Sequence, residues 1–215
     1  YRPNPYSRNY EGGGHVPLDR IAQASAEFLA NNQWKQKVGP KQRIPTSRIH
    51  PNTEPLTYHI GEITMEELKG SLKKMKRRKA PGPDGIPIEA FKECNEQNLQ
   101  CILDILNEWW TGEEIPEEAL LARVVLIFKK GDTGNLANYR PISLLNTTYK
   151  IFASILHKRI EQTVDKMLQE TQFGFRKNKG TADALSAIRR IIDHGEATNT
   201  KTLMVLLDWE KAFDK

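Results

Sequence analysis

The sequence of this 215-residue chain predicts an α+β fold. Apolar residues recur at helical spacing in several segments, and residues 122–145 hold two strand-like stretches around a turn, the first of them rich in β-branched residues. A further apolar stretch at 202–208 predicts a last strand. Helices on both sides of a hairpin, followed by a strand, are typical of an α+β domain whose sheet is only beginning when the chain ends.

Composition narrows the class of protein. The net charge is +5 and the sequence pI is about 9.1, which permits an anionic partner without requiring one. No apolar stretch approaches the roughly 18 residues of a membrane span, and the first residues do not follow the charged-then-apolar pattern of a signal peptide. We therefore expect an intracellular protein of the nucleus or cytoplasm, with no membrane partner. Cys94 and Cys101 fit no metal-binding pattern and are expected to be small core residues in a reducing compartment.

Residues 1–60 differ from the rest of the chain. Prolines and a triple glycine interrupt them, and only residues 18–34 show helical periodicity. We expect a linker or N-terminal extension that is partly disordered and contains one short helix.

The folded part is expected to begin near Ile60. Thr64 and Glu67 form a capping box at the start of a helix with a narrow apolar stripe. Lys79 then leads into a rigid loop of prolines and glycines that ends at Pro87. Backbone N–H groups in such loops can approach phosphates while lysines supply charge. The alternative is a helix stop with a solvated basic face.

Four further helices are expected. They cover about 88–93, 97–110 with Gly112 as its stop, 147–168, and 181–195 with Thr181 as its cap. The apolar faces expected to pack inward on the last two are Phe152, Ile155, Leu156, Ile160, Val164 and Met167, and then Leu185, Ile188, Ile191 and Ile192.

The predicted hairpin has strands over about 122–130 and 138–145, and three cations lie near its tip. Lys129 and Lys130 end the first strand, and Arg140 lies on the return strand. A hairpin brings such residues close together across the ladder. Arginine and lysine suit a polyphosphate. An ordinary solvated hairpin tip is the alternative.

The loop over 172–180 interleaves aromatic and basic residues. Its cations can contact phosphates, and its aromatic rings can stack on bases. For Phe173 and Phe175 the favoured interpretation is that both anchor the loop in the core. Arg176 is as well suited to a nucleic-acid or substrate contact as to a structural role.

Asp208 follows the last apolar stretch, so it emerges at the end of the predicted strand. Magnesium prefers hard oxygen ligands and is usually held by one or two carboxylates plus substrate phosphates. The carbonyl oxygen of Trp209 could add a ligand, and Phe213 would lie beside anything bound there. For an isolated aspartate at a strand end, helix capping or surface exposure is the alternative.

The order of these motifs is similar to that of the reverse transcriptases of non-LTR (LINE-type) retrotransposons. The matching segments are KAPGPDGIP, LIFKKGD, NYRPISLLNTTYKIF, QFGFRKNKGTADAL and LLDWEKAFDK, which cover about residues 60–215. The resemblance implies a right-hand polymerase, with fingers over 61–200 and the start of the palm, with its first strand, over 201–215.

The resemblance also implies roles for single residues. Asp208 matches the first metal-binding aspartate, and Phe213 matches the aromatic residue that screens the sugar 2′ position. Lys129 or Lys130, together with Arg140, matches the fingers residues that grip the triphosphate. The expected nucleic-acid contacts are Lys79, Arg176, Lys177 and Lys179.

The implied reaction is RNA-directed DNA synthesis. The 3′-hydroxyl of a DNA primer on an RNA template attacks the α-phosphate of a deoxynucleoside triphosphate, and pyrophosphate leaves. Two Mg²⁺ ions about 3.5–4 Å apart are expected in the complete site. The chain departs from the family because it contains no adjacent aspartate pair. We therefore expect the rest of the palm and the thumb elsewhere in the same polyprotein, and no polymerisation by these 215 residues alone. The alternative is a non-catalytic retroelement remnant that acts only as a nucleic-acid-binding module.

Overall fold

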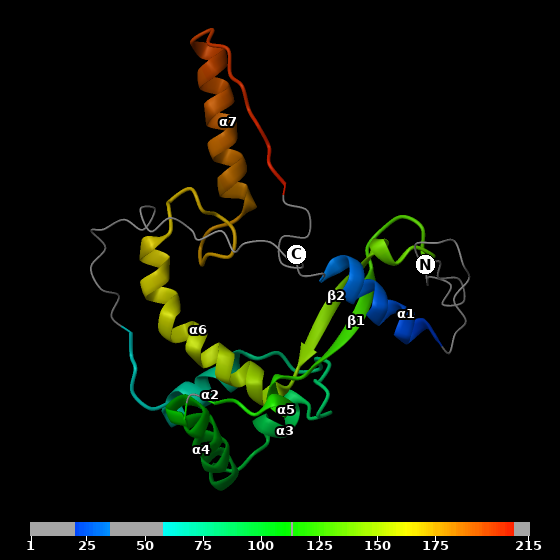
Figure 1. Cartoon of the computed structure of the whole chain (residues 1–215). Coiled ribbons are helices and arrows are strands. Elements are labelled where there is room, and N and C mark those ends of the chain that lie inside the picture. Colours follow the sequence, from blue (N-terminus) through cyan, green and yellow to red (C-terminus); the bar gives the residue numbers. More distant parts are fainter. Residues whose placement is uncertain (1–19, 35–57, 113, 209–215) are drawn as a thin grey trace, which may run out of the picture. The chain divides into compact units, whose positions relative to one another are not determined.

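The protein is a mixture of helices and strands, which confirms the α+β fold class (Figure 1). The computed structural model describes residues 20–34, 58–112 and 114–208. In this part of the chain no helix has the length and apolar character needed to cross a bilayer. The described residues form two compact units, the first with 20–34, 60–112 and 114–156, and the second with 58–59 and 157–208.

One short helix forms near the N-terminus. α1 (Ile21–Phe28) continues directly into a π-helical turn, η2 (Leu29–Gln33). Phe28 and Leu29 are buried, in agreement with the apolar periodicity of this stretch. This confirms the expected helix, whereas most of the predicted N-terminal linker lies outside the described residues.

α2 (Met65–Lys74) begins with the predicted capping box. The Glu67 N–H donates to Thr64 Oγ1 at 3.3 Å, and the Thr64 N–H donates to the Glu67 carboxylate at 3.0 Å. Leu68 and Leu72 lie four residues apart and are both buried. The helix therefore starts where its backbone donors are satisfied, and it packs through one narrow apolar stripe.

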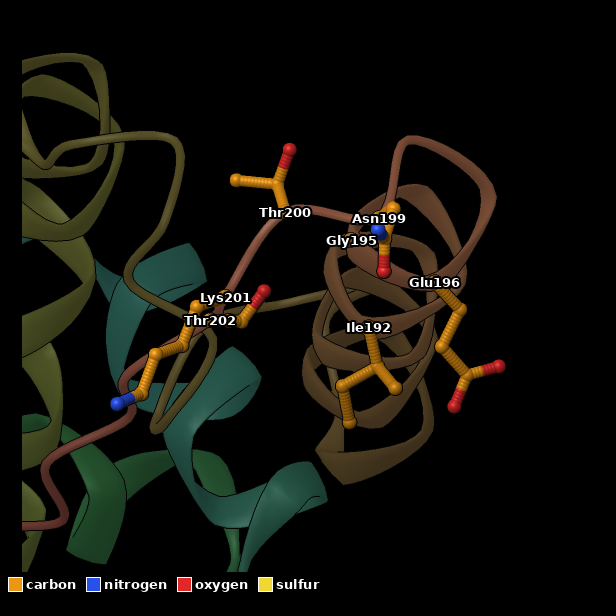
Figure 2. Close-up of a pocket in the computed structure, with 7 residues that line it drawn as sticks. All are labelled: Ile192, Gly195, Glu196, Asn199, Thr200, Lys201 and Thr202. Carbon is orange, nitrogen blue, oxygen red and sulfur yellow. The ribbon is translucent and has the colours of Figure 1, made fainter.

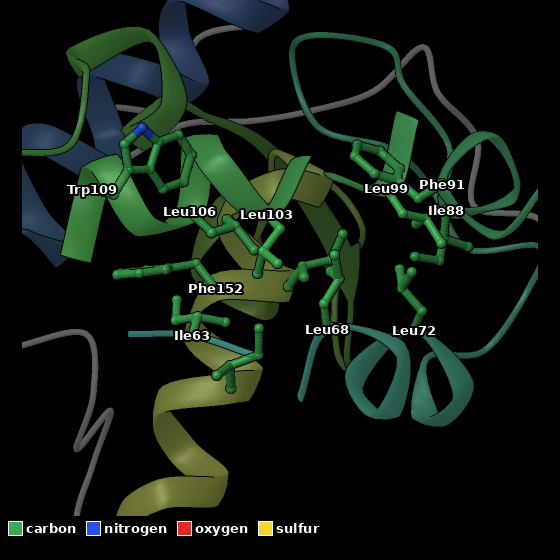
Figure 3. Close-up of a cluster of buried hydrophobic side chains, with 12 residues drawn as sticks. Ile63, Leu68, Leu72, Ile88, Phe91, Leu99, Leu103, Leu106, Trp109 and Phe152 are labelled. Carbon is green, nitrogen blue, oxygen red and sulfur yellow. The ribbon is translucent and has the colours of Figure 1, made fainter. Parts of the chain in front are cut away.

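The core of the first unit joins α2 to α3 (Ile88–Lys92), α4 (Glu96–Gly112) and the first half of α6 (Thr147–Met167) (Figure 3). Trp109 and Phe152 meet edge to face with ring centroids 5.7 Å apart. The buried cluster consists of Ile63, Leu68, Leu72, Ile88, Phe91, Leu99, Leu103, Leu106, Trp109, Ile151, Phe152 and Ile155.

The segment before α2 is fixed to α4 by side chains. Asn107 accepts a hydrogen bond from the Ile63 N–H at 2.6 Å and donates to the Ile63 carbonyl at 3.1 Å. Trp110 Nε1 donates to the Ile60 carbonyl at 3.2 Å. These bonds hold the chain against α4 from Ile60 onward.

Three details of this unit differ from the predictions. α5 (Glu117–Leu120) is a single helical turn after Pro116, too short to leave a periodic pattern in the sequence. Cys101 is exposed, so its predicted core position is wrong, whereas Cys94 is partly buried against the core. Gly112, expected just beyond α4, is its last helical residue.

β1 (Ala122–Phe128) and β2 (Tyr139–Leu145) form an antiparallel pair, which confirms the predicted hairpin. Pro141 lies opposite Leu126. Hydrogen-bonded and non-hydrogen-bonded residue pairs alternate along an antiparallel ladder. Lys129 and Asn138 form a hydrogen-bonded pair at its end. Leu126 and Pro141, three positions further along, are therefore a non-hydrogen-bonded pair. The missing N–H of Pro141 therefore removes no ladder bond.

α6 spans nearly the predicted range, but only its first half is buried. Ile151, Phe152 and Ile155 enter the core of the first unit. The predicted face continues in the second unit with residues that are exposed, namely Ile160, Val164 and Met167. The helical period of α6 was therefore predicted correctly, whereas the predicted burial of its second half is wrong.

α7 (Thr181–Ala197) corrects two predictions. Gly180, not Thr181, precedes the first helical residue, and its N–H donates to the Asp183 carboxylate at 2.8 Å. The predicted inward face is also wrong, because Leu185, Ile191 and Ile192 are exposed. Within the described second unit, α7 packs extensively against no other helix or strand, so its apolar stripe has no surface to cover it.

Residues 202–208 form no strand, so the predicted first palm strand is also wrong. Leu203, Val205, Leu206 and Leu207 are between 72% and 87% exposed. A strand needs a neighbour for its backbone hydrogen bonds. Among the described residues, the β1–β2 pair is the one sheet, and it does not include this segment.

Candidate functional site

Lys129 and Arg140 lie on the same face of the hairpin. Arg140 pairs with Ile127, and the Lys129 N–H donates to the Asn138 carbonyl at 2.9 Å, which continues the register by two residues. Because residues two apart on a strand point to the same side, the two cations are diagonal neighbours with Cα atoms about 7–8 Å apart. Both are exposed, so their heads are free to reach one polyanion.

Lys130 occupies a different position. It lies in the bend after β1 and begins the turn. The register therefore carries Lys129, and not Lys130, onto the face of Arg140. Both lysines stay predicted nucleotide contacts, with the geometry favouring Lys129.

The hairpin tip is held by its own side chains. Tyr139 donates its hydroxyl to the Thr133 carbonyl at 2.8 Å and packs against Phe128, with ring centroids 5.4 Å apart. Asn138 Nδ2 donates to the Asp132 carbonyl at 2.8 Å. These contacts order the backbone around Lys129, which lowers the conformational entropy lost when Lys129 binds a ligand.

The loop over residues 80–87 packs against the start of α6. The Asp84 N–H donates to Asn146 Oδ1 at 3.2 Å, and Thr147 Oγ1 donates to the Ile86 carbonyl at 2.7 Å. Asn146 Nδ2 also donates to the Glu118 carbonyl in α5 at 2.8 Å. Because β2 ends one residue before Asn146, these bonds join the 80–87 loop to the base of the hairpin.

Gly82 makes this contact possible. A Cβ atom at Gly82 would lie 2.5 Å from the backbone nitrogen of Asn146 and 2.5 Å from its Oδ1. Lys79, exposed at the start of the loop, thereby belongs to the same unit as the hairpin cations. Sequence reasoning explained the glycines of this loop by turns or close approach, but it did not identify Asn146 as the group approached.

In the second unit, Arg176 ties the 172–180 loop to α6. Its Nε donates to Asp165 Oδ1 at 2.7 Å, its Nη2 to Asp165 Oδ2 at 3.1 Å, and its Nη1 to the Gln169 carbonyl at 2.9 Å. The Arg176 side chain is only 11% exposed. Its hydrogen bonds lower the pKa of Asp165 and raise the pKa of Arg176. The guanidinium thus serves a structural role here, and its contact with nucleic acid stays a prediction.

The phenylalanines of this loop differ. Phe175 is fully exposed, at 104%, with a backbone φ of +60°, so the expectation that it anchors the loop in the core is wrong. Phe173 is half-buried, with Lys179 Nζ 5.5 Å from its ring centroid. Arg176 supplies the anchor that was expected from Phe175. A non-glycine residue at positive φ is uncommon, and such residues concentrate at functional sites.

A hollow of about 550 Å³ separates this loop from the second half of α6. It combines apolar side chains with both cations and carboxylates, among them exposed Lys177. Its lining residues are His157, Ile160, Glu161, Val164, Asp165, Lys166, Leu168, Phe175, Arg176 and Lys177.

The Asp165–Arg176 pair predicts a pH dependence of stability. Because the pKa of Asp165 is lower in the folded chain, the stabilisation is fully present above the unfolded value of about 3.9 and is lost as the pH falls through the folded value. We expect the urea midpoint of Asp165→Asn to lie below that of the wild type at pH 5–7 and to approach it below about pH 4. In an Arg176→Gln background the same substitution should show no such pH dependence. An equal pH dependence in both backgrounds contradicts the assignment.

The chain reverses direction after α7, and this turn leads to Asp208. Thr200 N–H donates to the Gly195 carbonyl at 2.8 Å, and Asn199 has a φ of +50°. Gly195 is buried, and a Cβ atom there would clash with the Thr202 hydroxyl. Figure 2 shows both residues among those at this turn. The hollow of about 370 Å³ at this turn is lined by Ile192, Gly195, Glu196, Asn199, Thr200, Lys201 and Thr202.

Asp208 is exposed at the end of this segment. Its carboxylate is a ligand type that Mg²⁺ prefers, but a single carboxylate does not make a site. Within residues 20–34, 58–112 and 114–208, no group of three or more acidic, histidine or cysteine side chains could hold a metal ion. The predicted partners Trp209 and Phe213 lie outside the described residues.

Comparison with known proteins decides the family. Residues 127–215 match the family described as reverse transcriptase (RNA-dependent DNA polymerase). The chain is 29% identical over 228 residues to the RNA-directed DNA polymerase from mobile element jockey of Drosophila melanogaster. It is 26% identical over 227 residues to the Retrovirus-related Pol polyprotein from type-1 retrotransposable element R1 of Bradysia coprophila. The chain belongs to the non-LTR (LINE-type) reverse transcriptases.

Membership in this reverse transcriptase family confirms the resemblance inferred from the motifs. The jockey match covers 100% of the chain and 24% of the relative, and the R1 match covers 98% and 22%. The Transposon TX1 uncharacterized 149 kDa protein of Xenopus laevis is 31% identical over 153 residues, which are 71% of the chain and 12% of the relative. The chain thus spans about a quarter or less of the length of these relatives. Enzymes of the family generally use a divalent metal ion.

Proposed function

We propose that this chain forms the fingers, over 61–200, and the start of the palm, over 201–215, of an RNA-directed DNA polymerase. The observation that carries the proposal is the hairpin register, which puts Lys129 and Arg140 on one exposed face. These two cations are the ones that the family motifs assign to the triphosphate. The family match and the motif order across residues 60–215 support the same function.

In the proposed reaction the hairpin cations act on the incoming nucleotide. Arg140 makes a bidentate contact with a phosphate, and Lys129, with Lys130 close by, adds a point charge. Both charges stabilise the negative charge that develops as pyrophosphate leaves. Phe213 excludes a ribose 2′-hydroxyl by its bulk, which selects deoxynucleotides.

Asp208 and the carbonyl oxygen of Trp209 would hold Mg²⁺, for which hard oxygen ligands are the suitable type. When bound, the metal supplies charge stabilisation at the attacking and leaving oxygens. Lys79, Arg176, Lys177 and Lys179 are the proposed contacts to the RNA template and DNA primer. We place the protein in the nucleus or cytoplasm, where a retroelement enzyme meets both nucleic acids.

A second candidate function rests on one observation. The sequence contains no adjacent aspartate pair, which the family uses to complete its metal site. A retroelement remnant that binds nucleic acid without catalysis would also lack it.

Primer extension distinguishes the two functions. The product of the complete reading frame that contains these residues should extend a DNA primer on an RNA template when Mg²⁺ is present, and chelation should stop it. The 215-residue chain alone should bind the primer–template without extending it. Binding without extension by the product of the complete frame favours the remnant and overturns the polymerase.

A further inference from the structure

A small basic groove lies in the first unit, away from the hairpin tip. It is about 260 Å³ in volume and lies between α2, α3 and the start of α4. Its apolar members, Leu72, Phe91 and Leu99, are buried and belong to the core. The remaining lining residues are all cations: Lys69, Lys73, Arg77 and Lys92.

Two of the four cations are paired with glutamates. Lys69 Nζ lies 2.7 Å from Glu96 Oε1, and Arg77 Nη2 lies 2.6 Å from Glu93 Oε1. All four of these side chains are substantially exposed, so each pair contributes little to stability. The pairs instead fix the positions of two cationic heads at the groove, and either glutamate can be exchanged for an incoming anion.

The other two cations form no salt bridge with the glutamates that pair with Lys69 and Arg77. Lys92 Nζ donates to the Met75 carbonyl at 2.6 Å and also lies in the electrostatic field of Glu89. Lys73 is exposed, and no ion pair is recorded for it among the described residues. The groove therefore presents net positive charge over an apolar floor, where an anion is screened less than in open water.

The turn beyond α2 is fixed, so the groove does not depend on a loose loop. Arg78 has a φ of +59°, and its N–H donates to Glu89 Oε1 at 2.6 Å. This bond joins the turn to α3 and aims the neighbouring Arg77 at the groove. The same turn leads to Lys79 and the 80–87 loop.

We infer that this groove is a phosphate site that holds the backbone of a nucleic acid. Cations from α2, from the turn that follows it and from α3 surround a position that one phosphodiester can occupy, and the groove borders the loop proposed to lie near the template. The choice of nucleic acid as the ligand rests on the proposed function, whereas the site itself takes no part in catalysis. The ordinary alternative is that Lys73 and Lys74 only stabilise the C-terminus of α2 through the helix dipole.

Lys73 and Lys74 provide a matched pair of variants for the test. Both lysines lie in the last turn of α2 and carry the same charge, but only Lys73 lines the groove. Fluorescence anisotropy of a labelled single-stranded RNA with the 215-residue chain should show about fivefold weaker binding for Lys73→Gln at 0.1 M salt. The slope of log K against log salt should fall by about 0.7, the value of one lost phosphate contact to a single strand. Lys74→Gln should change the affinity by less than about twofold, because an exposed charge outside the groove is screened.

A gain of binding gives an independent readout. Glu93→Gln removes the partner of Arg77, so RNA binding should become tighter, an effect that mere loss of folding cannot produce. Equal effects of Lys73→Gln and Lys74→Gln on RNA binding overturn the inference, as does a wild-type chain that binds no RNA. Primer extension tests the polymerase function separately from either outcome. Inorganic pyrophosphate binding that requires Lys73, with RNA binding unchanged, overturns the assignment to a nucleic-acid backbone.

Discussion

Gly82→Ala should destabilise the first unit by roughly 3 kcal/mol or more. The added Cβ atom would lie 2.5 Å from the Asn146 backbone nitrogen and 2.6 Å from its Cα atom, and backbone atoms cannot move aside as a flexible side chain can. Overpacking a core contact costs about 1–3 kcal/mol. Separating the 80–87 loop from α6 also breaks the bonds of buried Asn146 and Thr147, and each buried group left unpaired costs about 1–3 kcal/mol.

Gly112→Ala is the matched control for this prediction. Nothing lies within 4 Å of the Cβ position at Gly112, which is the last residue of α4. Alanine there should range from neutral to about 1 kcal/mol stabilising, because it favours the helix. Urea unfolding of both variants at constant m-value gives the comparison. Similar midpoints for the two variants contradict the proposed role of Gly82.

The elements of the first unit could be predicted because their signals are local. The Thr64–Glu67 capping box is contained within four residues, and the apolar stripe of α2 follows the helical period. The strands of the hairpin are close in sequence, so their turn fixes the pairing of Ile127 with Arg140. The cationic face proposed for the nucleotide was therefore within reach of sequence reasoning.

Long-range contacts were not predictable in the same way. Asn146 bonds to Asp84, which lies 62 residues earlier in the chain, and no periodic pattern links the two. The position of Arg176 also depended on a partner in the preceding helix, Asp165. With that bond made, the loop was anchored and Phe175 was left exposed.

Burial in the second unit shows what an apolar pattern leaves open. The stripe on α7 and the apolar run at 203–207 predict which surface is to be buried, but not what buries it. Helical hydrogen bonds lie within one segment, so α7 forms without a partner, whereas residues 202–208 need a neighbouring strand to become one. The environment of Asp208 could not be predicted for this reason, although its identity as a candidate ligand could.

Asp208→Ala should abolish primer extension by the product of the complete reading frame. Metal-ion stabilisation of the reacting oxygens is worth several kcal/mol, and each 1.36 kcal/mol changes the rate tenfold, so a loss on the order of 10³-fold or more is expected. Primer–template binding should stay within about twofold or become tighter, because the variant removes a negative charge that faces a polyanion. Single-turnover extension and anisotropy on the same preparation measure the two effects.

Asp193→Ala controls for the loss of an aspartate in the same unit. Asp193 is exposed on α7, carries the same charge and has no role in the proposed reaction, so its variant should extend primers at the wild-type rate. The Asp208→Ala and Asp193→Ala variants should then differ in the rate of primer extension but not in primer–template binding. Extension by Asp208→Ala at the wild-type rate, or an equal loss in Asp193→Ala, removes Asp208 from the active site. A loss confined to Asp208→Ala, with binding retained, assigns the effect to the reacting centre, because a folding defect would lower both.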